Sequence, residues 1–186
     1  MRASGAVVPT HLEATTRSDS VKRVRVTGIN HVSIPALDVD ETMRFYQEVF
    51  GMERIPSPNF GGPVRWLRLG DLQLHIFSVA EQPRRTYQHL GIEVDDFEAA
   101  YLKLRELDAF EEGSRFRYLF ELPSGEVQMY FRDPSDNLVE IDWPDVETLD
   151  RSVFGDDLKR LDEWFPQSGE SLRATLFLRP RDRAPV

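Results

Sequence analysis

The sequence predicts an α+β fold made of two βαβββ units, and three observations support this prediction. Two segments resemble each other, and each begins with a histidine in a short aliphatic or β-branched run, at His31 and at His89. Each run stops at an Asp-x-x-Glu cluster of the kind that starts a helix. Two strand-like stretches then follow each helix. The length of 186 residues suits one domain built from such a repeat.

The first unit covers about residues 31–78. Its opening strand ends at Asp38, a good N-cap, and Glu41 can reach back to the N–H of that cap. The predicted helix has an apolar stripe at helical spacing, formed by Val39, Met43, Tyr46 and Phe50. The stretches VRWLRLG and DLQLHI then predict two strands joined at Gly70 and Asp71.

The second unit covers about residues 89–142 and repeats this order. Its helix is predicted to start at the cluster from Asp95 to Glu98. The apolar stripe of that helix consists of Phe97, Tyr101 and Leu104. Two strands, VQMYFR and NLVEI, are predicted on either side of a turn at Asp133-Pro-Ser-Asp.

The chain divides into a patterned centre and two different ends. The predicted parts are a flexible arm at 1–26, a central domain at 27–143 with modules at 27–80 and 86–143, and a C-terminal extension at 144–186. Within the extension, apolar residues over 145–165 predict a helix that packs against the sheet or a second subunit. The last residues, RPRDRAPV, predict a disordered end.

Composition excludes several classes of protein. The formal net charge of -9 argues against a protein that works by neutralising nucleic acid or an anionic membrane. With no cysteine, the chain has no disulfide, thiolate metal site or cysteine nucleophile. No apolar run reaches the roughly 18 residues of a membrane span, and no compact apolar segment of a secretory signal is present near the N-terminus. A cytoplasmic protein is expected.

Three of the four histidines occupy strand positions that the repeat relates to one another. The alignment matches His31 with His89 and His75 with Glu140, while His11 lies in the arm and has no expected role. Glu140 has apolar neighbours on both sides, so an inward-facing carboxylate there needs a partner that offsets its desolvation. A metal ion is the simplest such partner. The alternative is that Glu140 faces outward on an amphipathic strand.

These residues resemble the vicinal oxygen chelate superfamily. The resemblance rests on His31, the helix that ends at Gly51, and the run Asp133-Pro-Ser-Asp-Asn-Leu-Val-Glu140. The group includes glyoxalase I, fosfomycin-modifying transferases, methylmalonyl-CoA epimerase, extradiol dioxygenases and metal-free bleomycin-binding proteins. It implies two modules whose curved, mixed sheets form a cupped metal site. It also implies that His31, His89 and Glu140 hold the metal, converging on one point from three strands.

The residue at position 75 distinguishes the types of enzyme within this superfamily. Glyoxalase I enzymes similar to this chain have a carboxylate or amide there, whereas this chain has His75. Two histidines and a carboxylate are typical of Fe(II) oxygenases. The chain is therefore most similar to a one-domain type I extradiol dioxygenase, which has an acid–base histidine on this strand and a tyrosine before the metal glutamate, as Tyr130 precedes Glu140. It departs from that group in having Asp136 where a glycine or proline is usual, and in having two modules instead of four.

The leading hypothesis is an Fe(II)-dependent ring-cleavage dioxygenase that uses dioxygen and a catechol-type small molecule in aromatic catabolism. The resemblance implies that His75 moves the catechol proton, with a role as fourth metal ligand as the alternative. Tyr130 would hydrogen-bond the substrate, and Trp66 and Phe77 would form an aromatic wall.

Two rival hypotheses use the same fold. A glyoxalase-like lyase, isomerase or thiol transferase would work without oxygen and accept Ni, Co, Mn or Zn in place of iron. A metal-free binding protein is disfavoured because all four ligand candidates are present. A homo-oligomer is expected in either enzyme, since a two-module protein leaves outer strands exposed.

Overall fold

The structure is a computed structural model. It describes residues 28–81, 84, 87–112 and 118–177. The predicted N-terminal arm and the whole of the predicted disordered end, RPRDRAPV, lie outside the described residues.

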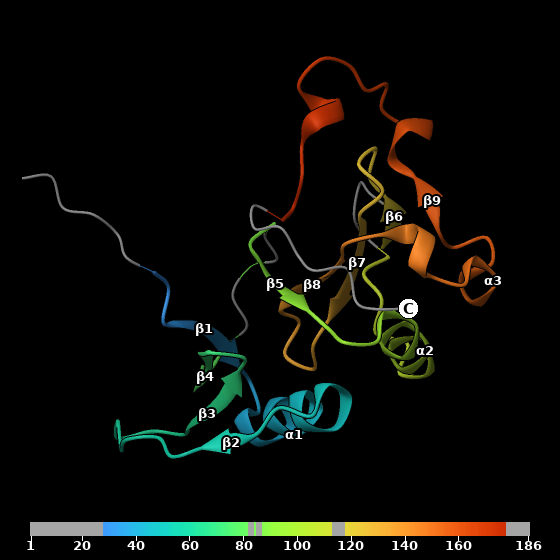
Figure 1. Cartoon of the computed structure of the whole chain (residues 1–186). Coiled ribbons are helices and arrows are strands. Elements are labelled where there is room, and N and C mark those ends of the chain that lie inside the picture. Colours follow the sequence, from blue (N-terminus) through green and yellow to red (C-terminus); the bar gives the residue numbers. More distant parts are fainter. Residues whose placement is uncertain (1–27, 82–83, 85–86, 113–117, 178–186) are drawn as a thin grey trace, which may run out of the picture.

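Two modules of the same topology form the centre of the chain (Figure 1). The first module contains β1 (His31–Ala36), α1 (Val39–Phe50), β2 (Arg54–Ile55), β3 (Val64–Leu69) and β4 (Leu72–Ser78). The second contains β5 (His89–Glu93), α2 (Phe97–Glu106), β6 (Leu119–Glu121), β7 (Val127–Arg132) and β8 (Leu138–Trp143). Their sheets have the strand orders β1-β4-β3-β2 and β5-β8-β7-β6-β9. Both predicted βαβββ units are confirmed.

Strand pairing follows the same register in the two modules. The parallel pair β1 and β4 places Ser33 opposite His75, and the parallel pair β5 and β8 places Gly91 opposite Glu140. Ser33 and Gly91 each lie two residues after the first histidine of their module. The alignment of His75 with Glu140 in the sequence is therefore also an equivalence in space.

Aspartate caps begin both long helices. The Asp38 carboxylate accepts hydrogen bonds from the backbone N–H groups of Asp40 and Glu41, as the sequence predicts for α1. In α2 the cap is Asp96, which accepts from the N–H of Ala99, so the helix starts one residue later than predicted from the Asp-x-x-Glu pattern. Phe97, the first residue of the helix, packs in the core, where it is 1% exposed.

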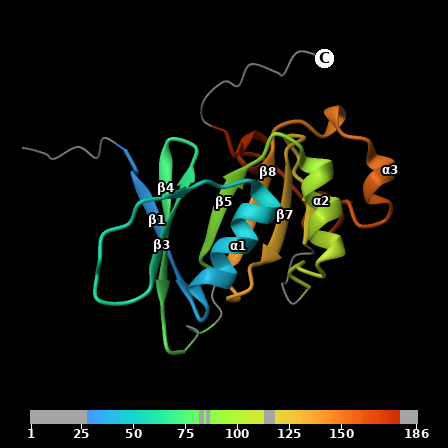
Figure 2. The ribbon, with the colours of Figure 1, turned by 90° about the horizontal axis from the view of Figure 1, so that it is seen from below.

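The helices cover one side of the two sheets (Figure 2). α1 and α2 contact each other and lie side by side over the sheets. Alternate strand residues point toward the helices and form the core with helix residues. The strand residues include Leu67, Leu74, Ile76, Met129, Phe131 and Ile141, and the helix residues include Tyr46, Phe97 and Tyr101. The other strand residues therefore lie on the opposite side of the sheets, which we call the open face. In the described part of the chain no helix is both long and apolar enough to cross a bilayer.

The loop between β7 and β8 joins the second module to the first. Asp133, Ser135 and Asn137 of this loop are hydrogen-bonded to groups of β1, α1 and the turn between them; these groups are Pro35 O, Leu37 N, Thr42 Oγ1 and the Tyr46 hydroxyl. The sequence identified this segment only as a turn. We call residues 133–137 the inter-module loop.

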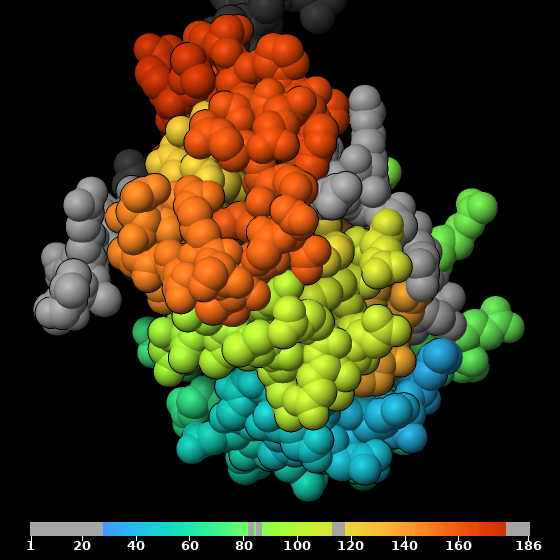
Figure 3. All heavy atoms as spheres, turned by 90° about the vertical axis from the view of Figure 1, so that its right-hand side faces the viewer, coloured from blue at the N-terminus to red at the C-terminus, as the bar shows by residue number. Residues whose placement is uncertain are grey.

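The C-terminal extension packs as predicted but is largely not helical. It contains short 3-10 turns at Val146–Thr148, Leu161–Glu163 and Ser171–Arg173, a four-residue helix α3 (Arg151–Phe154), and β9 (Lys159–Arg160). The predicted helix over 145–165 is therefore wrong in form, because α3 stops after one turn at Gly155, whose φ of 55° is unfavourable for other residues. Phe154 nevertheless contacts Phe97 and Tyr101 in the core. Figure 3 shows the extension lying against the second module.

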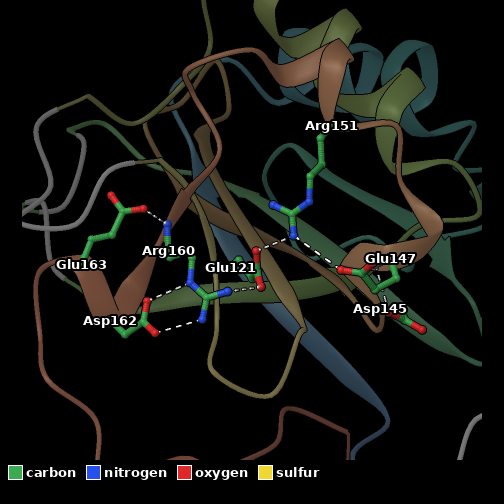
Figure 4. A network of polar contacts seen from close by, with 7 residues as sticks. All are labelled: Glu121, Asp145, Glu147, Arg151, Arg160, Asp162 and Glu163. Atoms are coloured by element: carbon green, nitrogen blue, oxygen red, sulfur yellow. Dashed lines mark hydrogen bonds and ion pairs between the residues drawn. The ribbon is translucent and has the colours of Figure 1, made fainter.

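Two arginines attach the extension to the second sheet. β9 pairs in parallel with β6, and the carboxylate of Glu121 in β6 binds Arg151 at 2.8 Å and Arg160 at 3.1 Å (Figure 4). Glu121 is 6% exposed, so the two guanidinium groups offset the cost of burying its charge.

Candidate metal centre

Strand alternation places three of the five predicted site residues, His75, Tyr130 and Glu140, on the open face. In β4, His75 alternates with Leu74 and Ile76, which lie in the core. In β8, Glu140 alternates in the same way between Val139 and Ile141. Trp66 is the cross-strand partner of His75, and Tyr130 is the cross-strand partner of Glu140. Both partners therefore also lie on the open face. The alternative in which Glu140 is a solvated surface residue is not supported, because Glu140 is 4% exposed.

The first module brings His31 and His75 together. Their rings are stacked, with centroids 4.3 Å apart and an interplanar angle of 15°. The indole of Trp66 stacks on the other side of His75 at 4.1 Å. His75 is therefore enclosed between two rings and is 7% exposed. Burial, followed by the neighbouring His31, lowers the pKa of His75.

The second module brings His89 and Glu140 together. His89 Nε2 lies 2.6 Å from Glu140 Oε2. The other carboxylate oxygen of Glu140 accepts a hydrogen bond from the Gln128 amide. The Tyr130 ring packs edge-on against His89, at 5.7 Å between centroids. Burial and the charge of Glu140 raise the pKa of Tyr130, so its hydroxyl keeps its proton.

The hydrogen bonds of His31 and His89 match, and those of His75 differ. His31 Nδ1 lies 2.5 Å from Asn30 Oδ1, and His89 Nδ1 lies 2.8 Å from the Tyr87 carbonyl oxygen. Since these oxygens can only accept, both Nδ1 atoms carry a proton, which leaves Nε2 of His31 with a lone pair and turns Nε2 of His89 toward Glu140 Oε2. Metal-binding histidines commonly have this arrangement. In His75 it is Nε2 that donates to a side-chain oxygen, that of Gln73 at 2.9 Å.

The predicted convergence of His31, His89 and Glu140 on one point does not occur within the described part of one chain. Across 28–81, 84, 87–112 and 118–177, no three histidine, aspartate or glutamate side chains are close enough to hold one metal ion. The four ligand candidates instead form two pairs, which we call the first half-site (His31 and His75) and the second half-site (His89 and Glu140).

Sequence reasoning missed three polar residues of the open face. Gln73 lies two residues before His75, Gln128 two before Tyr130, and Asp142 two after Glu140. The alternation of a strand gives the signal that could have identified them. Burial, followed by Glu140, raises the pKa of Asp142. This accumulation of carboxylates around Glu140 is an environment that a cation would stabilise.

Known proteins match this chain in both sequence and fold. The model of the Glyoxalase/Bleomycin resistance protein/Dioxygenase superfamily matches residues 28–141. A protein of Arabidopsis thaliana named Glyoxylase I 4 is 29% identical over 137 residues, which are 67% of this chain and 75% of that protein. The metallothiol transferase FosB of Shouchella clausii is 29% identical over 124 residues, which are 62% of this chain and 80% of FosB.

Two solved structures share the fold at lower identity. The fosfomycin resistance protein FosX of Listeria monocytogenes has a TM-score of 0.55 and 21% identity, covering 66% of this chain and 95% of FosX. A lactoylglutathione lyase of Agrobacterium tumefaciens has a TM-score of 0.50 and 23% identity, covering 63% of this chain and 94% of that structure.

Proposed function

Because the chain belongs to the glyoxalase/bleomycin resistance protein/dioxygenase superfamily, we propose that it is a metal-dependent enzyme acting on a small oxygenated molecule. The reaction we favour is lyase, isomerase or thiol-transfer chemistry, since the relatives reported above are a glyoxalase and a thiol transferase. The observation that carries the proposal is the pair of equivalent half-sites on the open face. This reverses the order of the two hypotheses drawn from the sequence, where the dioxygenase came first.

The donors of the second half-site fit a divalent metal ion. His89 Nε2 and Glu140 Oε2 are 2.6 Å apart, close to the roughly 3 Å that separates two ligands each about 2.1 Å from one ion. We propose His31, His89 and Glu140 as metal ligands; His75 is either the fourth ligand or an acid–base residue. Imidazole and carboxylate donors suit Zn, Ni, Co, Mn and Fe(II) alike, so the donor set alone does not select one ion.

We propose that a second copy of the chain completes the site. Within the described residues, β1 and β5 are edge strands that each leave one side without a strand partner. Both half-sites lie on the open face, because their residues alternate along the strands with core residues. In a dimer with twofold symmetry, the first half-site of each copy can meet the second half-site of the other, which gives two complete sites.

The remaining residues of the site bind and orient the substrate. A bound divalent ion supplies Lewis-acid polarisation of the substrate oxygens. The Tyr130 hydroxyl, which stays protonated, donates a hydrogen bond to a substrate oxygen. The Gln128 amide fixes the Glu140 carboxylate, and Gln73 fixes the ring of His75. If His75 does not bind the metal, its position beside His31 allows it to accept a proton from the substrate.

Extradiol ring cleavage is the second candidate. The observation that favours it is the position of Tyr130, whose ring packs against His89 and whose hydroxyl interacts with the Glu140 carboxylate, so that it would be placed to hydrogen-bond a catechol held by these ligands. Anaerobic loading with Fe(II), followed by catechol and air, tests it. A yellow ring-fission product would return this reaction to first place, whereas oxygen-independent turnover with several metals supports the lyase or transferase.

The experiment that tests the proposal mixes two inactive variants. His31→Ala disables the first half-site and Glu140→Gln the second, so each variant alone is expected to be inactive on the hemithioacetal of methylglyoxal and glutathione, or on fosfomycin with a thiol. After denaturation and joint refolding, half of the dimers contain one copy of each variant, and one of their two sites is intact. The mixture should regain about a quarter of the wild-type activity and a quarter of its bound metal.

A site built within one chain would give no recovery in this mixture. His11→Ala is the matched control, because this histidine lies outside the proposed ligands, and it should leave metal content unchanged. Full metal binding by both single variants would overturn the ligand assignment itself.

A further inference from the structure

We propose that Phe60, Trp66 and Phe77 form a subsite that binds a planar aromatic or conjugated group of the substrate. The subsite lies on the open face of the first module, beside the first half-site. The inference rests on the proposed function, because it assigns the substrate class of the same site.

The three rings form one cluster that reaches His75. Phe60 lies 6.1 Å from Trp66 and 6.0 Å from Phe77, measured between ring centroids. Phe77 contacts the His75 ring edge-on at 6.3 Å, and Trp66 stacks on it at 4.1 Å. A substrate whose oxygens lie beside His75 would therefore hold its neighbouring group against this cluster.

Packing of the core does not account for the cluster. Trp66 and Phe77 alternate along their strands with the core residues Leu67 and Ile76, so they lie on the side away from α1. Phe60, in the segment between β2 and β3, is 57% exposed, although it is a large apolar side chain. Trp66 and Phe77 are half-buried, so Phe60 is the exposed edge of the cluster, and exposed apolar groups that adjoin a polar site are typical of ligand-binding sites.

A tryptophan at position 66 also lowers stability in a way that a purely structural position would not require. Its Nε1 is buried and has no hydrogen-bond partner among the described residues. A buried N–H without an acceptor costs stability, which a phenylalanine or leucine in this place would avoid. Unfavourable groups of this type are concentrated at functional sites.

The second module shows that the two halves have different chemistry. Its residues equivalent to Trp66 and Phe77 are Tyr130 and Asp142, because each occupies the same position relative to Glu140 as the first two do to His75. One half of the site is thus apolar and aromatic, and the other is acidic and hydrogen-bonding. This division suits a substrate with a planar apolar end and an oxygenated end.

The test uses two chelators that differ only in the group beside the oxygens. Benzohydroxamate and acetohydroxamate present the same pair of oxygen atoms to a metal, but only the first has a phenyl ring. Binding of each to the Zn-loaded, full-length protein is measured by isothermal titration calorimetry. Benzohydroxamate should bind about 10- to 100-fold more tightly, as expected for burial of one ring against aromatic side chains.

Variants locate the preference. Phe60→Ala should reduce the ratio of the two affinities to about 3-fold or less while acetohydroxamate binding stays unchanged. Leu102→Ala is the matched control, since this residue of α2 is 43% exposed on the helical side of the sheets, and it should keep the full ratio. Because Phe60 is exposed, its loss should not impair folding, and Trp66→Phe provides a second variant that retains a ring.

The results separate a failure of the aromatic subsite from a failure of the proposed metal site. If both chelators bind with equal affinity, the aromatic subsite is refuted and the metal site stands. If neither binds to protein that contains zinc, the proposed function fails and the subsite fails with it. A preference for the phenyl compound that survives Phe60→Ala would also overturn the assignment.

Discussion

Replacing Ser135 by alanine tests how the two modules are held together. Ser135 lies in the inter-module loop and is 2% exposed. Its Oγ is 2.7 Å from the Thr42 hydroxyl at the start of α1, and it accepts a hydrogen bond from the Leu37 N–H at 3.2 Å. Both partners belong to the first module, so the substitution removes two contacts between the modules and leaves each module intact.

The expected loss follows from the burial of the two partners. Thr42 is 0% exposed, so its hydroxyl would lose a partner where water cannot replace it, at a cost of about 1–3 kcal/mol. Leu37 is 53% exposed, so its N–H can bind water and should add at most about 1 kcal/mol. The free energy of unfolding should therefore fall by about 1–4 kcal/mol.

Urea unfolding followed by tryptophan fluorescence measures this loss. The midpoint should fall by about 1 M with the slope unchanged, and the exposed Ser152→Ala should shift it far less. Because Thr42→Val removes the other partner, the double variant should be at least about 1 kcal/mol more stable than the sum of the single losses predicts. A loss below about 0.5 kcal/mol for Ser135→Ala, or strict additivity, would refute this account of the inter-module contact.

Three further predictions concern the site, the pH dependence and the C-terminal extension. If His75 is an acid–base residue, His75→Ala should leave bound metal unchanged while turnover falls about 10²–10⁴-fold; if it is a ligand, metal content measured on the purified variant should fall as well. Burial raises the pKa of Tyr46 far above its ordinary value, so stability present at neutral pH should be lost above about pH 10, by about 1.4 kcal/mol per pH unit. Tyr46→Phe should remove that part of the slope in urea unfolding between about pH 9 and 11. Replacing both Arg151 and Arg160 by alanine strands the buried carboxylate of Glu121 and should lower the melting temperature more than Glu121→Gln, which removes the charge itself.

The sequence predicted the modules because their signals are local. A histidine-led strand, an aspartate cap and an apolar stripe all occur within about twenty residues and occur twice. The C-terminal extension failed as a helix prediction because its structure depends on distant partners. β9 forms where Arg160 reaches Glu121, 39 residues earlier in the chain, and nothing in the local pattern indicates that contact.

The sequence could predict which residues pair within each half-site, but it could not predict how the two half-sites lie relative to each other. Alternation places His75 and Glu140 on one face of their strands, and the repeat makes the pair of His31 and His75 equivalent to the pair of His89 and Glu140. How the two faces meet depends on the inter-module loop and on any second copy, and both involve contacts between residues far apart in the chain. The expected convergence within one chain assumed that equivalent residues must also be neighbours.

The difference at position 75 bears on what the proposed site can stabilise. Register equivalence would have allowed two glutamates, one from each module, but the first module supplies a neutral imidazole instead. With Glu140 as the single anionic donor, a bound divalent ion would keep one positive charge, which favours the negative oxygen that develops when a carbonyl substrate loses a proton. The lost carboxylate is also a lost base, so proton transfer would have to fall to His75 or to the substrate's own partner. A histidine instead of a glutamate at position 75 therefore favours an anionic intermediate, and it makes proton transfer at this site depend on His75 or the substrate's partner.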